Sequence, residues 1–358
     1  MTYLVPTMAE IAKVKGSNGF TMVSTFSGCG GSCLGFEMAG FNLLWANEFI
    51  EEARTTYKAN HPGVILTDSD IREITAESIL NNTGLKIGEL DLFEGSPPCA
   101  SFSTAGIREK AWGKVKKYSD KVQQADDLFF EYARLVKGLQ PKVFIAENVT
   151  GLVKGKAVGY FKLILKELKE AGYTVEVKIL DASYLGVPQA RQRVIFIGVR
   201  NDLVEKYGVK PAFPKPFHYR YSFNDAVNTL KKPENPFIDP ETSHPIGLGN
   251  AVGIEWEKLR DGGQSTKYFQ LVKPFANKPI GTITASGGQV GLASITHPYE
   301  KRKFNLQELR RVSSFPDDFE LTGTYQQRWE RIGRSVPPLM AKAIADVIRD
   351  EILAKVTM

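Results

Sequence analysis

Cysteine and histidine are scarce in this 358-residue sequence, which contains three cysteines and four histidines. The cysteines are Cys29, Cys33 and Cys99, and so odd and sparse a set argues against a disulfide framework and for a reducing compartment. Cys29 and Cys33 lie four residues apart, but no second Cys or His pair follows at the spacing of zinc ligands. We therefore expect neither a disulfide framework nor a metal site.

Long apolar runs are also absent. No uninterrupted apolar stretch is long enough to span a bilayer. Residues 1–16 lack the apolar core and the small-residue cleavage site of a signal peptide. These absences predict a cytoplasmic protein with no membrane partner.

The charge balance is mildly basic, with a formal net charge of +6. This favours a polyanionic partner such as nucleic acid, although charge alone is equally compatible with a basic soluble protein that has none. Hydrophobic residues make up 42% of the chain, enough for the core of one large domain and a smaller one.

Strand-like and helix-like segments alternate through the first two-thirds of the chain. The strand candidates are residues 21–26, 42–46, 64–66, 90–93, 143–146, 174–180 and 194–199. The helix candidates between them are residues 33–39, 50–60 and 126–139. This alternation predicts a doubly wound, mostly parallel α/β sheet, with ligands at the carboxyl ends of its strands.

The pattern changes after about residue 200. Residues 201–300 are rich in Pro and Gly and show no helical periodicity, so we expect a second, smaller, irregular β-containing domain there. Helical periodicity returns at residues 305–315 and 337–353. We expect residues 301–358 to return to the main domain, which comprises residues 1–200.

A glycine cluster, Phe26-Ser27-Gly28-Cys29-Gly30-Gly31, follows the first strand candidate. Glycines there let a ligand approach the backbone at a helix N-terminus. A dinucleotide site would need a third glycine where Cys33 stands. Glu48, about 20 residues on, can hold a ribose diol, and Asp70 with Ile71 can grip an adenine. Together these residues fit S-adenosylmethionine better than a dinucleotide, although a plain tight turn remains an alternative for the glycines.

Three further motifs follow later strand candidates. Cys99 stands behind Pro97 and Pro98 on a rigid loop, and is either a nucleophile or an inert buried thiol. Glu147, in Glu-Asn-Val, would face the same sheet edge, or else cap a helix. Arg191 and Arg193, in Gln-Ala-Arg-Gln-Arg, lie on one side of an extended segment. Their guanidinium groups can hold a carbonyl oxygen, a carboxylate or a phosphate, or are ordinary surface charges.

Taken in order, these motifs resemble the cytosine-C5 DNA methyltransferase family. The ordered set reads FSGCGG, NE, DI, PPC, ENV, QARQR and GRSVPP, across residues 21–200 and 301–350. The resemblance implies a class I, Rossmann-like methyltransferase that uses S-adenosylmethionine and acts on double-stranded DNA. It also implies a bacterial or phage-encoded enzyme of a restriction-modification or similar system, which we expect to act as a monomer.

The resemblance assigns a role to each matching residue. Cys99 would be the nucleophile, Glu147 would engage N3 and the exocyclic amine of cytosine, and Arg193 would bind its O2 carbonyl with support from Arg191. The residues implied for the methyl-donor site are Phe26, Gly28, Gly30, Gly31, Glu48, Phe49, Asp70, Ile71, Pro98, Leu128 and Ser335. To reach these residues, the target cytosine must swing out of the DNA helix.

The resemblance also assigns a function to each part of the chain, and at two positions this chain differs from the family pattern. Residues 1–200 would form the catalytic and donor-binding domain and residues 201–300, with Thr-Ile-Thr-Ala at 282–285, the target-recognition domain. The basic stretch 101–121 would contact phosphates. The family has Gln where Ala100 stands and Asn where Arg334 stands, so we expect altered affinity with the covalent chemistry intact.

Three other functions remain open on the sequence. A tRNA cytosine-C5 methyltransferase would keep the chemistry and change the substrate. A non-catalytic DNA- or donor-binding relative is disfavoured by the intact Cys99, Glu147 and Arg193. An NAD-dependent oxidoreductase would leave PPC and QARQR without a role.

Overall fold

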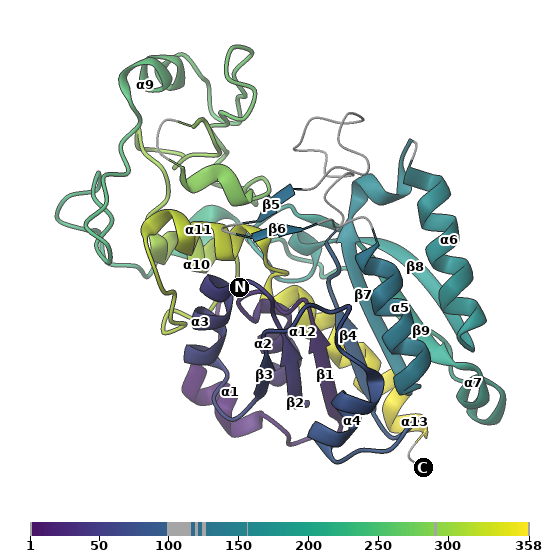
Figure 1. Cartoon of the computed structure of the whole chain (residues 1–358). Helices are drawn as coiled ribbons and strands as arrows, with labels where there is room; N and C mark the ends of the chain where they lie inside the picture. The colour runs from purple at the N-terminus through teal and green to yellow at the C-terminus, as the bar shows by residue number, and fades with distance from the viewer. Residues whose placement is uncertain are drawn as a thin grey trace. The chain divides into compact units, whose positions relative to one another are not determined.

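The computed structural model describes residues 2–98, 116–118, 121–123, 127–155, 157–289 and 292–356. The chain forms two compact units (Figure 1). The unit that we call the sheet unit contains residues 12–180, 192–214 and 342–358. The other, which we call the loop-rich unit, contains residues 1–11, 181–191 and 215–341.

A seven-stranded sheet with the order β3-β2-β1-β4-β7-β9-β8 organises the sheet unit. Its strands are β1 Thr21–Thr25, β2 Asn42–Asn47, β3 Ile65–Thr67, β4 Leu92–Gly95, β7 Val143–Val149, β8 Tyr173–Asp181 and β9 Gln192–Arg200. The pairs β1–β2, β2–β3, β1–β4 and β4–β7 are parallel, and β7–β9 is antiparallel. The predicted doubly wound, mostly parallel sheet is confirmed. A separate two-stranded pair joins β5 Lys116–Tyr118 to β6 Lys121–Gln123.

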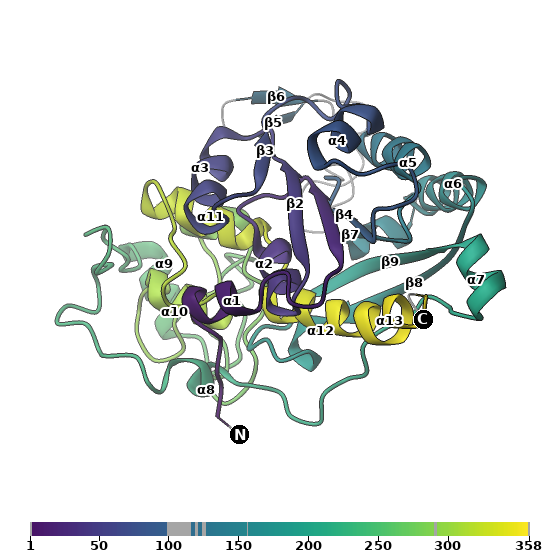
Figure 2. The same cartoon turned by 90° about the horizontal axis from the view of Figure 1, so that it is seen from below.

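Helices cover both faces of the sheet (Figure 2). They are α2 Gly31–Met38, α3 Glu51–Asn60, α4 Ala76–Thr83, α5 Leu128–Leu139, α6 Ala157–Glu170, α7 Asn201–Tyr207 and α13 Ala354–Val356, with a π-helical turn at Ile348–Leu353 and a 3-10 turn at Thr150–Val153. Apolar residues of α4, α5 and α6 form one core with β1, β4 and β7, while α2 and the C-terminal helical segment lie on the opposite face. Helices α1 Met8–Val14 and α12 Pro338–Val347 contain residues of both units.

Tyr132 of α5 shows how this core fixes the central strands. Its ring is fully buried and stacks on Phe93 with 4.8 Å between ring centroids. Its hydroxyl donates to the carbonyl of Phe93 at 3.1 Å and to that of Ile145 at 2.9 Å. A buried phenol needs such partners, and here they tie β4 to β7.

The loop-rich unit contains only short elements in its described part. Its helices are α8 Phe223–Val227, α9 Asn250–Glu257, α10 Leu306–Val312 and α11 Tyr325–Arg334, with 3-10 turns at Ala182–Tyr184 and Ala285–Gly288. Its β structure consists of isolated bridges such as Gln264 to Val272.

Residues 201–300, which show no helical periodicity in the sequence, contain the short helices α7, α8 and α9. These helices have five to eight residues, too few for a period of 3.6 to be visible in the sequence. Capping stabilises α8 instead: the Ser222 hydroxyl accepts from the Asp225 N–H, and the Asp225 carboxylate accepts from the Ser222 N–H.

None of the helices within the described ranges has both the length and the apolar character needed to cross a membrane.

Gly198 offers a test of the core packing, because it is the residue of β9 that pairs with Phe144 of β7 and has no side chain. A Cβ at Gly198 would lie 2.0 Å from the ring of Phe144, its register partner. We expect Gly198→Ala to lower the free energy of unfolding by about 1–3 kcal/mol through overpacking. Gly159→Ala on α6 is the matched control, because its Cβ would meet nothing within 4 Å. Thermal unfolding of both variants checks the prediction, and equal midpoints would contradict it.

Candidate active site

The predicted site residues of the sheet unit lie at one edge of the sheet, where the parallel strands end. Strands β1, β2, β3, β4 and β7 run in one direction, so their carboxyl ends meet at this edge, and antiparallel β9 begins there. The predicted residues that follow or end these strands, or begin β9 or α5, are Phe26, Gly28, Gly30, Gly31, Glu48, Phe49, Asp70, Ile71, Pro98, Leu128, Glu147 and Arg193.

The turn after β1 is a left-handed stretch of backbone. Phe26 has φ +55°, Gly28 +57° and Gly30 +90°. A non-glycine residue in this region is uncommon and marks a conformation held by its surroundings. The N–H of Ser27 donates to the Asn47 carbonyl and that of Gly30 to the Ser27 carbonyl, after which Gly31 begins α2. The first N–H groups of α2 therefore point toward this edge.

His61 packs directly behind the glycine turn, a contact that the sequence did not predict. A Cβ at Gly30 would lie 2.1 Å from His61 Nε2, so the space admits only glycine. The ring is stacked on Tyr57, and its Nδ1 lies 2.8 Å from Glu37 Oε2. Lys15 Nζ lies 2.8 Å from the other oxygen of Glu37. Burial opposes ionisation of Glu37, but His61 and Lys15 hold the pKa of this carboxyl below its ordinary value.

Glu48 joins the turn after β2 to the glycine turn. One carboxylate oxygen accepts the N–H of Gly28 at 2.7 Å, and the other accepts the N–H of Ile50 at 2.7 Å. The carbonyl of Phe49 accepts from the Arg54 guanidinium at 2.7 Å. These bonds fix the Glu48 carboxylate between the glycine turn and the start of α3.

Asp70 and Ile71 lie in the turn after β3. The guanidinium of Arg72 reaches Asp70 at 3.0 Å and Asp127 at 2.7 Å, and so joins this turn to the start of α5. Ile71 is buried, and Leu128 is fully buried beside Asp127. The structure thus brings the predicted acidic residue and apolar wall of the third turn together.

Glu147 and Arg193 form an ion pair at this edge. Arg193 Nε lies 2.5 Å from Glu147 Oε1, and the two side chains are 13% and 14% exposed, respectively. Their meeting follows from the strand register, in which Val149 pairs with Arg193 and Glu147 with Ile195. The pair therefore has both a fixed position and access to a ligand.

The adjacent Asn148 ties the same strand to the loop after β4. It is buried, and its Nδ2 donates to the carbonyl of Pro97 at 3.1 Å. Cys99 and Ala100, two residues further along, lie outside the described residues, as do the side chains of residues 101–121. The nucleophile and the basic loop therefore remain predictions.

Arg191 and Ser335 belong to the loop-rich unit. The buried Arg191 guanidinium donates to the carbonyls of Ile283, Gly333 and Arg334 at 3.1, 3.0 and 3.4 Å. It thereby connects the QARQR motif to the GRSVPP motif. The hydroxyl of Ser335 donates to the Arg331 carbonyl at 2.8 Å.

Arg334, which stands where the family has Asn, also has a side-chain partner. Its Nε donates to Glu330 at 2.8 Å, within helix α11. The substitution of Arg for the family's Asn therefore adds an ion pair on the surface of this helix.

A second unpredicted residue, Glu94, lies buried in β4. It is 3% exposed, and the Ser24 hydroxyl donates to its Oε2 at 2.5 Å. Burial raises the pKa of Glu94 to about 7, the hydroxyls of Ser24 and Ser32 oppose this, and the Glu147 carboxylate raises it further. An acidic residue inside an apolar strand was visible in Leu-Phe-Glu-Gly, and buried carboxyls are rare enough to mark a special position.

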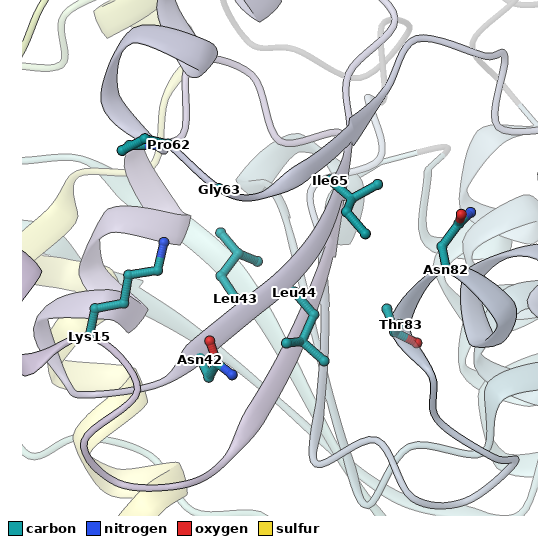
Figure 3. Close-up of a pocket in the computed structure, with 9 residues that line it drawn as sticks. All are labelled: Lys15, Asn42, Leu43, Leu44, Pro62, Gly63, Ile65, Asn82 and Thr83. Atoms are coloured by element: carbon teal, nitrogen blue, oxygen red, sulfur yellow. The ribbon is translucent and has the colours of Figure 1, made fainter.

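A pocket of about 400 Å³ lies at the opposite, amino-terminal end of β2 and β3 (Figure 3). It is lined by Lys15, Asn42, Leu43, Leu44, Pro62, Gly63, Ile65, Asn82 and Thr83. None of these is a predicted site residue, so the pocket is separate from the edge that carries Glu147 and Arg193.

The described ranges contain no cluster of side chains that could bind a metal ion. No group of three His, Cys, Asp or Glu side chains gathers there as metal ligands would. Cys29 and Cys33 are buried, and neither is part of a disulfide.

The fold matches that of solved methyltransferases. A proposed DNA modification methyltransferase encoded within an E. coli prophage has a TM-score of 0.73 and 22% identity, over 93% of this chain and 99% of that one. A DNMT2 mutant from Spodoptera frugiperda has a TM-score of 0.65 and 17% identity, over 95% of this chain and 100% of that one. The architecture is that of a class I, Rossmann-like methyltransferase.

Sequence comparison narrows the class. The model of the C-5 cytosine-specific DNA methylase family matches residues 20–350. The type II methyltransferase M.NgoPII of Neisseria gonorrhoeae is 31% identical, over 93% of this chain and 96% of its own length. M.PspPI of Psychrobacter is 32% identical, over 95% and 81%. The chain belongs to the C-5 cytosine-specific DNA methylase family, and is an enzyme of that class.

The glycine turn yields a first prediction for this edge. We expect Gly30→Ala to lower the unfolding midpoint by several degrees, because its Cβ would meet the His61 ring in addition to the left-handed backbone strain. Gly19→Ala is the control: its φ of +77° carries the same strain, but nothing lies within 4 Å of its Cβ. Differential scanning calorimetry compares the two, and the prediction is refuted if Gly30→Ala is no less stable than Gly19→Ala.

Glu94 yields a prediction about pH. Its folded pKa of about 7 lies above the ordinary 4.5, so the folded protein binds this proton more tightly than the unfolded chain does. Its contribution to stability is full below pH 4.5 and is lost as the pH rises to about 7. Glu94→Gln cannot titrate, so its stability relative to wild type should increase over this window, by up to about 3 kcal/mol.

Urea unfolding of both proteins at pH 5 and pH 8 measures this difference. Subtraction of the two proteins cancels the titration of all other groups. A difference that does not change with pH would show that Glu94 is not the buried acid described here.

Proposed function

We propose that this enzyme transfers a methyl group from S-adenosylmethionine to C5 of a cytosine swung out of double-stranded DNA, with Cys99 as the nucleophile. The observation that carries the proposal is the Glu147–Arg193 ion pair, held beside the loop that leads to Cys99. The type II names of the relatives further suggest that the target lies in a specific sequence of a modification system.

The residues around the glycine turn fit the donor. Glu48 directly follows β2 beside the glycine turn, to which its carboxylate is hydrogen-bonded, and a carboxylate in this position can accept from a ribose diol. The buried Ile71 and Leu128 can border an adenine, with Asp70 as a polar contact. The N–H groups that begin α2 can hold the amino-acid carboxylate. Phe26, Phe49 and Pro98 complete the proposed lining, and the bound donor supplies an electrophilic methyl group.

Glu147 and Arg193 complement one edge of a cytosine. O2 and N3 are neighbouring ring atoms, and the ion pair presents a guanidinium donor beside a carboxyl group. Arg193 would donate to O2 and offset the negative charge that builds up there. Glu147 would hold N3 and the exocyclic amine, and place a proton on N3.

The proposed chemistry begins when the Cys99 thiolate adds to C6 and N3 receives a proton. Addition breaks the aromaticity of the ring and makes C5 a nucleophile that takes the methyl group. A base, such as a water molecule, then removes the C5 proton, the electron pair expels the thiolate, and N3 returns its proton to Glu147. Asn148 supports these steps by fixing Pro97, and hence the loop before Cys99.

The loop-rich unit would read the DNA. Its segment 264–272 is organised around the buried Ser265, whose hydroxyl accepts the N–H groups of Lys267 and Tyr268. Phe269 on this segment is 78% exposed. An apolar ring beside an exposed lysine suits contact with bases and phosphates. Arg191 would act by holding residues 333 and 334, which precede Ser335, the residue of this unit that the resemblance implies for donor binding.

The substrate is tested by incubating the protein with labelled donor and either duplex DNA or tRNA, and then sequencing the product. Methylated cytosines at one recurring DNA sequence would support the proposal and identify that sequence. Methylation of tRNA alone would replace it with the tRNA activity.

Glu147→Gln tests the role of the carboxyl. We expect it to lower kcat by roughly 10²–10⁴-fold, because an amide cannot deliver a proton to N3. Donor affinity should change little. The control is Glu170→Gln, which alters an exposed carboxyl on α6. Single-turnover methylation and donor titration check the two expectations, and a kcat within twofold of wild type would contradict the assigned role.

A further inference from the structure

Glu94 sits between the two halves of the proposed site and has no part in the chemistry above. In the register of the sheet it pairs with Ser24 of β1 and Ile145 of β7. Its neighbour Phe93 stacks on Tyr132 of α5. Because side chains alternate along a strand, Glu94 points to the opposite face, toward Ser24 and α2.

A chain of hydrogen bonds runs from Glu94 to the glycine turn. The Ser24 hydroxyl donates to Glu94 at 2.5 Å, and Ser24 and Ser27 hydroxyl oxygens lie 2.8 Å apart. A hydroxyl has one proton, so Ser27 must donate to Ser24 when Ser24 donates to Glu94. The carbonyl of Ser27 accepts from Gly30. The carboxyl of Glu94 is thus the acceptor at the end of a chain that begins in the turn.

The donor and its demethylated product differ in charge at the sulfur atom. S-adenosylmethionine carries a sulfonium cation, and S-adenosylhomocysteine a neutral thioether. A carboxylate buried beneath the turn attracts the first and not the second, and the attraction is strong because little water screens it. Glu94 is the buried carboxyl that is bonded to this turn through side-chain hydroxyls.

We propose that Glu94 is a positioning residue whose buried carboxylate favours the cationic methyl donor over the neutral product at the glycine turn. The inference rests on the proposed function, since it takes S-adenosylmethionine as the donor. Methyl transfer would remove the cation that Glu94 attracts, and so would weaken the hold on the product. Donor binding in turn would favour the ionised carboxyl and release a proton.

Other titratable groups lie near Glu94, and the test must separate their ionisation from that of Glu94. Cys33 on α2, Tyr57 on α3, Tyr132 on α5 and Glu147 on β7 all interact with it electrostatically. Burial raises the pKa of Cys33 to about 12 and those of both tyrosines well above the usual value, so these three stay neutral near pH 7.

His61 and Glu37 also face the glycine turn, and Arg193 pairs with Glu147. A change of pH that acts through any of these residues persists in Glu94→Gln. The amino group of the ligand titrates near pH 8, but it is common to donor and product. Comparison of the two ligands therefore cancels it.

The test is titration calorimetry of the whole protein with each ligand at pH 6.0 and pH 8.5. For wild type we expect the preference for donor over product to increase roughly three- to tenfold between these pH values, as Glu94 ionises. In Glu94→Gln the preference should not change with pH. At pH 7, wild type should release a fraction of a proton on binding the donor, measured in buffers of different ionisation enthalpy, and Glu94→Gln should release less.

Asp91→Asn is the matched control. Asp91 is a buried carboxyl just before the same strand, where it accepts from Thr21 and pairs with Lys142. Its loss should leave the pH-dependent preference intact. A wild-type preference that does not change with pH, or one that persists in Glu94→Gln, overturns the inference while leaving the proposed function in place. Failure of the folded wild-type protein to bind either ligand overturns both.

The measurements on wild type can be made without any variant. If Glu94→Gln does not fold, Ser24→Ala serves as the second variant. Removal of the Ser24 hydroxyl breaks the chain between Glu94 and Ser27. The pH-dependent preference should then be smaller than in wild type, and an undiminished preference would count against the proposed link.

Discussion

The antiparallel pairing of β9 with β7 is the constraint on which the active edge depends. In an all-parallel sheet the start of a neighbouring strand would lie at the far edge from Glu147. The reversed direction of β9 instead brings Arg193, near its first residue, back to the end of β7. Glu147 and Arg193 can therefore meet at 2.5 Å although they are 46 positions apart in the chain. An ion pair so placed combines a fixed geometry with the small exposure that a ligand needs to reach it.

A set of buried polar groups supports this edge from within the sheet unit. The Glu48 carboxylate accepts a hydrogen bond from the glycine turn, and the His61 ring packs against Gly30. Glu94 is linked to the turn by hydrogen bonds through Ser24 and Ser27. Buried polar groups are costly unless they are bonded. Their concentration around one turn fits the proposal that a charged methyl donor binds there and needs the turn in one conformation.

The sequence predicted the sheet strands closely because buried parallel strands are short, continuous apolar runs. It predicted which turns would meet, because parallel strands must end at a common edge. It did not predict α8 and α9, which are too short to show a period, nor the contact of His61 with Gly30, which exists only in the folded chain. Nor did it predict that Arg191 and Arg193, two residues apart, each have separate partners in their own unit. The functions of Cys99 and the target-recognition segment still rest on motif resemblance.

The central claim is that Cys99 bonds to the cytosine ring, and mass spectrometry of a trapped complex tests it most directly. DNA that carries 5-fluorocytosine at the target site cannot lose a proton from C5, so the enzyme should remain covalently attached after methyl transfer. The account predicts one adduct with the mass of protein, DNA and a methyl group, present in wild type and in the buried-thiol control Cys33→Ala, and absent in Cys99→Ser. An adduct formed equally well by Cys99→Ser, or none in an active wild-type enzyme, would contradict it.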